Sequence, residues 1–133
     1  MNYNLGKLEK ITNLREVWKN EATDFTKWLA KENNIKLLSE ELGFNITVDE
    51  TEASTGRYNV DIKAHEEETD KTIIIENQLE SSNHEHLGKI ITYASGLDAQ
   101  VVVWIVKNAK EEHRSAIEWL NNNTNSDINF FLI

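Results

Sequence analysis

The fold is most readily inferred from TIIIENQL, residues 72–79. Three consecutive isoleucines predict a strand that is buried on both faces, as the central strands of a helix-covered sheet are. Glu76 and Gln78 follow at a spacing of two, so their side chains project from the same face of that strand. A carboxylate in such a strand is costly to bury unless a partner or a metal ion compensates it. The stretch therefore predicts a central strand with a polar site on it.

The patterns around this strand predict a mixed sheet covered by helices. The expected strands are residues 44–53, 57–64, 72–79, 100–106 and 127–133, and the expected helices are residues 14–31, 34–42, 84–97 and 109–122. Asn34 is expected to cap the second helix, with Gly43 just beyond its end. A meander followed by alternating helices and strands predicts an α/β fold in a single domain over residues 1–133.

The composition limits the chemistry that this chain can carry out. Its 133 residues include no cysteine, which excludes disulfides, thiolate metal sites and cysteine nucleophiles, and which fits a cytoplasmic location. No stretch is apolar enough to span a membrane, and no glycine-rich nucleotide-binding motif occurs. The formal net charge is −9, so nucleic acid would have to be bound through a local patch or a metal ion.

A second carboxylate is expected beside Glu76. Asp61 lies in YNVDIKA, residues 58–64, on the preceding expected strand, and a short hairpin can bring it next to Glu76. Two neighbouring carboxylates could hold Mg²⁺ or Mn²⁺, because these cations prefer oxygen ligands. The alternative is a pair of solvated acidic side chains on a wet sheet face. The isoleucines before Glu76 favour the metal site.

These motifs resemble the PD-(D/E)XK nuclease superfamily, which has the restriction-endonuclease-like fold. The superfamily places an Asp and a Glu-x-Lys motif on adjacent strands of an αβββαβ core, to which this chain would add a C-terminal helix and strand. Residues 73–105, IIIENQLESSNHEHLGKIITYASGLDAQVVVWI, also resemble a group of small prokaryotic proteins with this fold and an E-x-Q variant. The resemblance implies a metal-dependent nuclease that hydrolyses phosphodiester bonds, with DNA favoured over RNA as substrate.

The resemblance also implies roles for individual residues. Asp61 and Glu76 match the metal-binding carboxylates of the motif, and Gln78 stands where the catalytic lysine is usual. Glu21 best matches the acidic residue of the first helix in the superfamily. Glutamine can hydrogen-bond a water molecule but carries no positive charge. Lys89, on the following helix, could supply that charge; the alternative for it is a solvated surface position.

The helix expected over residues 84–97 carries further substrate-binding candidates. His86, Lys89 and Tyr93 share one of its faces at helical spacing. The last two occupy the place where related nucleases often have a QxxxY motif. His84 and His86 flank Glu85 at the helix start, and this HxH pattern can bind a metal ion; a capping or substrate contact is the alternative.

The remaining histidines and the tryptophans have simpler explanations. His65 and His113 are expected at the surface or in structural contacts. Trp104 is expected in the core, and Trp119 is expected to pack inward from an amphipathic helix.

Two other functions stay open. One is a catalytically inactive domain that binds nucleic acid or protein, which Gln78 and the net charge of −9 favour. The other is a structural subunit of a homodimer, which the apolar ending NFFLI suggests.

Overall fold

The isoleucine run forms the centre of a five-stranded mixed sheet. The computed structural model describes residues 24–55 and 58–133. The strands are β1 (Ile46–Thr55), β2 (Tyr58–Glu66), β3 (Thr72–Ser81), β4 (Val101–Asn108) and β5 (Asn129–Leu132), in the spatial order β1-β2-β3-β4-β5. The helices are α2 (Thr26–Leu29), α3 (Glu32–Leu42), α4 (His84–Leu97) and α5 (Glu111–Asn123). The predicted mixed α/β architecture is therefore confirmed over these residues.

Strand β3 joins the antiparallel and the parallel halves of the sheet. It pairs antiparallel with β2 and parallel with β4, and β4 pairs parallel with β5. The side chains of Ile73, Ile74 and Ile75 have no exposed area. Strand β3 thus has a strand on each side and is buried on both faces, as its sequence predicts.

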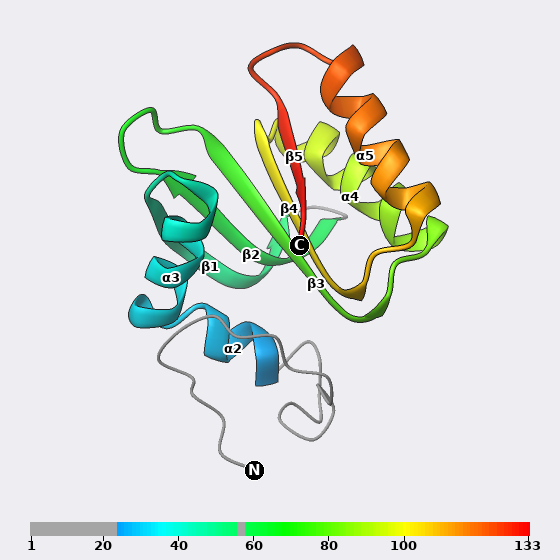
Figure 1. Cartoon of the computed structure of the whole chain (residues 1–133). Helices are drawn as coiled ribbons and strands as arrows, with labels where there is room; N and C mark the ends of the chain where they lie inside the picture. The colour runs from blue at the N-terminus through cyan, green and yellow to red at the C-terminus, as the bar shows by residue number, and fades with distance from the viewer. Residues whose placement is uncertain (1–23, 56–57) are drawn as a thin grey trace.

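Helices cover both faces of the sheet, and the alternation along β3 assigns each side chain to one of them. Figure 1 shows α4 and α5 together on one side and α2 and α3 on the other. Ile73 and Ile75 pack in the cluster that contains residues of α2 and α3, and Ile74 packs in the cluster that contains residues of α4 and α5. The even-numbered residues of β3, which include Glu76 and Gln78, therefore belong to the α4/α5 face.

The chain before β1 differs from the predicted helices. The first helix is described only from residue 24 onward, and it ends at Leu29. The second helix begins at Glu32, with Lys31 in the capping position, so the prediction that Asn34 is the N-cap is wrong. The side chain of Asn34 instead donates a hydrogen bond of 2.7 Å to the carbonyl of Trp28 and ties α2 to α3. Gly43 ends α3 with a φ of 89°, as expected.

The two tryptophans of the C-terminal half differ in their environment. Trp104 is fully buried on β4, as predicted. Trp119 is 63% exposed, so the prediction that it packs inward is wrong. The inward face of α5 is formed by His113 and Ile117, and Trp119 lies two residues further along, which turns it away from the sheet.

The apolar C-terminal end is used inside the sheet. It forms β5, and Phe130 is buried against the α4/α5 face. Among the residues that the structure describes, no strand pairs with the outer edge of β5. The side chain of Asn121 on α5 accepts a hydrogen bond from the main-chain N–H of Phe130 at 2.8 Å and donates one to its carbonyl at 2.9 Å. Asn121 therefore occupies part of an edge that could otherwise pair with another chain.

Removing this edge contact should destabilise the fold. We expect Asn121→Ala to lower the free energy of unfolding by about 1–2 kcal/mol relative to Asn122→Ala, because two hydrogen bonds are lost only in the first variant. Asn122 is the matched control, since it is exposed on the same helix and gains the same helix propensity. Urea denaturation measures both values. Equal stabilities of the two variants would contradict the assignment.

Candidate functional site

Asp61 and Glu76 meet where the main-chain pairing of β2 and β3 ends. The paired register of the two strands stops at Ile62 and Ile75. One residue further, the main-chain N–H of Asp61 donates to Oε1 of Glu76 at 3.2 Å. The main-chain N–H of Asn77 donates to Oδ2 of Asp61 at 2.7 Å. Each carboxyl group is thus held by the main chain of the opposite strand.

Glu76 holds its proton more tightly than an ordinary glutamic acid. The residue is only 7% exposed. Burial, followed by the negative charge of Asp61, raises the pKa of Glu76 to about 8, and the positive charge of Lys89 offsets part of this effect. At pH 7 the carboxyl pair therefore retains a proton in the absence of a cation.

The chemistry of this pair suits a hard divalent cation. Its donors are carboxylate oxygens, which Mg²⁺ and Mn²⁺ prefer. A cation between them would take over the role of the retained proton, because both remove the repulsion of two adjacent negative charges. No group of three or more His, Asp or Glu side chains with metal-binding geometry occurs in residues 24–55 and 58–133. Asp61 and Glu76 are the two neighbouring carboxylates that could hold such a cation.

Gln78 lies deeper than a residue that orients a solvent molecule. It has no exposed area. Its Oε1 accepts a hydrogen bond of 3.0 Å from the indole N–H of Trp104, and its Nε2 donates one of 3.0 Å to the carbonyl of Ser81. The amide oxygen thus holds the ring of Trp104 on β4, and the amide nitrogen holds the main chain of Ser81 at the end of β3.

The expected substrate-binding residues lie on α4. Lys89 is on the exposed side of the helix, with its Nζ 3.8 Å from Oε1 of Glu85, and its charge acts on Glu76. Tyr93 is half-buried against the α4/α5 face of the sheet. His86 takes part in the helix cap: its main-chain N–H donates to Oδ1 of Asn83 at 2.8 Å, and its Nδ1 lies 3.2 Å from the same oxygen. Lys89 is thus linked to Glu76 through its charge, whereas His86 is engaged in the helix cap.

Glu21, the acidic residue expected on the first helix, lies outside the described residues. Close to the carboxylate pair, sequence reasoning missed Asn77. This residue is 3% exposed and donates a side-chain hydrogen bond of 2.8 Å to Thr26 of α2. Its amide ties the strand of Glu76 to the opposite helical layer. The signal was a third polar residue within a strand that is otherwise apolar.

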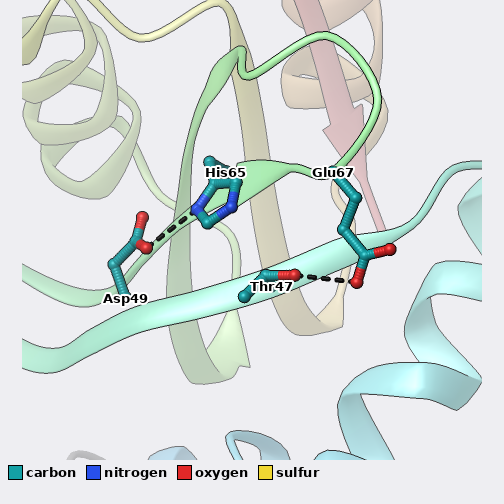
Figure 2. Close-up of polar contacts among 4 residues, drawn as sticks. All are labelled: Thr47, Asp49, His65 and Glu67. Atoms are coloured by element: carbon teal, nitrogen blue, oxygen red, sulfur yellow. Dashed lines mark hydrogen bonds and ion pairs between the residues drawn. The ribbon is translucent and has the colours of Figure 1, made fainter.

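Sequence reasoning also missed a buried polar cluster at the end of β3. Ser82 and His113 are buried and hydrogen-bonded to each other, and His113 also contacts His84 at the start of α4. The position of His113 four residues before Ile117, on the inward face of α5, was the available signal. His65, by contrast, lies on β2 in an ion pair with Asp49 of β1 (Figure 2).

Comparison with known proteins identifies one related fold. A repair endonuclease from Pyrococcus abyssi superposes with a TM-score of 0.55 at 10% sequence identity, over 74% of this chain and 44% of that one. This chain thus spans less than half the length of that endonuclease. No protein-family model and no curated protein sequence matches the chain. The likeness confirms the predicted restriction-endonuclease-like fold.

The described part of the chain contains no helix with the length and apolar character needed to cross a membrane.

The raised pKa of Glu76 should make the metal-free protein less stable as the pH rises. Between pH 4.5 and about 8 the folded chain keeps a proton that the unfolded chain has lost, so the free energy of unfolding falls through this interval. Glu76→Gln removes this loss. We expect the variant to be more stable than the wild type by roughly 4–5 kcal/mol near pH 9, because the pKa of Glu76 is raised from 4.5 to about 8 and one pKa unit corresponds to about 1.4 kcal/mol.

Urea denaturation in the presence of a chelator, repeated between pH 5 and pH 9, measures this difference. Glu40→Gln is the matched control, because Glu40 is exposed on α3. Its stability should follow the wild type at every pH. Parallel curves for Glu76→Gln and the wild type would contradict the assigned pKa.

Proposed function

We propose that this chain is a metal-dependent nuclease that hydrolyses phosphodiester bonds of nucleic acid. The observation that carries the proposal is the contact between buried Glu76 and half-buried Asp61, with the pKa of Glu76 at about 8, on a restriction-endonuclease-like sheet. Two carboxylates are seldom brought together in a buried place unless a cation or a proton compensates them. The resemblance to the PD-(D/E)XK superfamily, with its E-x-Q variant, supports the same proposal from the amino-acid sequence.

In this proposal Asp61 and Glu76 hold Mg²⁺ or Mn²⁺. Such a cation, when bound, lowers the pKa of a water molecule and neutralises negative charge on the phosphoryl group. The main-chain hydrogen bonds across β2 and β3 keep both carboxyl groups in place before the cation arrives. Glu21 remains a candidate third carboxylate.

The residues of α4 face the nucleic acid in this proposal. Lys89 provides positive charge near the scissile phosphate, because its charge already acts on Glu76. In addition, the nucleic-acid strand contacts His84, His86 and Tyr93. Gln78 acts through Trp104, whose position it fixes, and is a positioning residue. DNA is the favoured substrate and RNA the second one to test.

A second function is favoured by a specific observation. Gln78 replaces the usual lysine, and both ends of its amide are used within the fold. A net charge of −9 and the missing lysine therefore favour a catalytically inactive domain that binds nucleic acid or protein. The homodimer alternative loses its original support, since the apolar ending that suggested it forms β5.

A cleavage assay distinguishes the two functions. We expect the wild type to cleave single- or double-stranded DNA in Mn²⁺ or Mg²⁺, and we expect Glu76→Gln to be inactive. Lys89→Ala should lower the rate roughly 100-fold, as the loss of one group that stabilises the transition state does. Lys36→Ala is the matched control and should cleave at the wild-type rate, because Lys36 is exposed on α3, on the opposite face of the sheet.

Each outcome of the assay decides one point. Equal rates for Lys89→Ala and the wild type would remove Lys89 from the mechanism. If the wild type cleaves neither DNA nor RNA with either cation, the binding function replaces the nuclease.

A further inference from the structure

Three polar side chains form a continuous hydrogen-bonded path from the core to the surface. Ser82 has no exposed area and His113 is 2% exposed, whereas His84 is exposed. Oγ of Ser82 lies 2.6 Å from Nδ1 of His113, and Nε2 of His113 lies 2.7 Å from Nδ1 of His84. We call these three residues the Ser82–His113–His84 chain. Burying such groups in this arrangement is costly unless each donor meets an acceptor.

The Ser82–His113–His84 chain adjoins the candidate site through the α4/α5 face. The ring of His113 packs edge-on against Trp104, with 5.9 Å between the centroids. Trp104 donates its indole N–H to Gln78, which lies two residues beyond Glu76 on the same face of β3. His84 begins α4, the helix whose Lys89 acts on Glu76. His84 is therefore at the exposed end of a packed path that starts at the carboxylate strand.

The direction of each hydrogen bond follows from the buried end. The main-chain N–H of Lys110 donates to Oγ of Ser82 at 2.9 Å. The Ser82 hydroxyl still has its own proton to donate, and we assign Nδ1 of His113, 2.6 Å away, as its acceptor. This leaves the proton of His113 on Nε2, from which it donates to Nδ1 of His84. The proton of neutral His84 is then on Nε2, the nitrogen on the far side of its ring.

The electrostatics agree with a neutral His113. Burial and the neighbouring His84 both lower the pKa of His113. A neutral imidazole is needed at this point, because Nδ1 must accept a hydrogen bond while Nε2 donates one.

We propose that Ser82 and His113 are positioning residues that hold His84 with its Nε2–H directed outward, where it donates a hydrogen bond to a phosphate oxygen of the bound nucleic acid. The inference deepens the proposed function and rests on it for the identity of the ligand. A donor with a fixed direction at the start of a helix suits an anionic oxygen, because the positive end of the helix dipole acts in the same sense. In this inference the bound nucleic acid extends from the carboxylate pair to His84.

The orientation can be measured without any nucleic acid. Long-range ¹H–¹⁵N correlation spectra report which ring nitrogen of each histidine carries the proton. We expect the Nε2–H form for His113 and for His84 in the wild type at pH 8. Ser82→Ala should give mixed forms of both rings, and Ser82→Thr, which keeps the hydroxyl, should restore them. An Nδ1–H form of His113 in the wild type would overturn the assigned direction of the hydrogen bonds, whatever the variants show.

The contact is tested with a short fluorescein-labelled DNA, single- and double-stranded, in Ca²⁺ as a cation that prefers oxygen ligands. We expect His84→Ala to weaken binding roughly tenfold, because it removes a hydrogen bond to a charged phosphate. We expect Ser82→Ala to weaken binding only roughly threefold, because it leaves that donor in place and removes only the group that orients it. The Nε2 signal of His84 should shift as DNA is added. His65→Ala is the matched control and should bind as the wild type does, because His65 pairs with Asp49 on β1 (Figure 2).

The outcomes separate this inference from the proposed function. Wild-type binding by His84→Ala, with no shift of the Nε2 signal, would overturn the phosphate contact and leave the nuclease proposal standing. If the wild type binds no nucleic acid, both the proposed function and the phosphate contact fail, and the ring spectra still decide whether the Ser82–His113–His84 chain is oriented as stated.

Discussion

The site depends on one exchange of hydrogen bonds between β2 and β3. Where the ladder ends at Ile62 and Ile75, the carboxyl groups of Asp61 and Glu76 take up main-chain N–H groups of the opposite strand. Buried N–H groups need acceptors, and carboxylates are strong ones. The same bonds that satisfy the strand ends therefore bring two acidic groups into contact, and burial, followed by the repulsion between the two groups, raises the pKa of Glu76.

The α4/α5 face supports this pair with a layer of polar side chains set among apolar ones. Gln78 accepts the indole N–H of Trp104, and Trp104 packs against His113, which is hydrogen-bonded on both sides of its ring. A partly satisfied network of this kind would cost more than an apolar core, and a fully satisfied one fixes side-chain positions. Rigid support is what a site needs if its groups are to be held in place before a ligand binds.

Much of the fold follows from local patterns in the amino-acid sequence. The isoleucine run and VVVW predict two adjacent central strands, and β3 and β4 pair as expected. The spacing of Glu76 and Gln78 correctly predicts a shared face. The contact of Asp61 with Glu76 follows from a short hairpin, although its register could not be derived, because the main-chain pairing ends just before these residues.

Long-range contacts account for what the sequence did not reveal. Asn34 looks like a helix cap, but its amide bonds to Trp28 across a turn, a contact that local propensity does not include. Gln78 matches a catalytic position, yet its environment depends on Trp104, 26 residues away. His113 shows only an inward-facing spacing, because its partners Ser82 and His84 lie some thirty residues earlier in the chain.

The proposed metal site requires the Asp61–Glu76 pair to exchange its retained proton for a divalent cation. Calorimetric titration with Mn²⁺ at pH 7, in two buffers of different ionisation enthalpy, measures the affinity and the number of protons released together. We expect binding with release of about one proton per cation, since the pKa of Glu76 lies near 8. We also expect Glu76→Ala to lose this binding. Equal binding by Glu76→Ala, or wild-type binding without proton release, would contradict the proposed exchange.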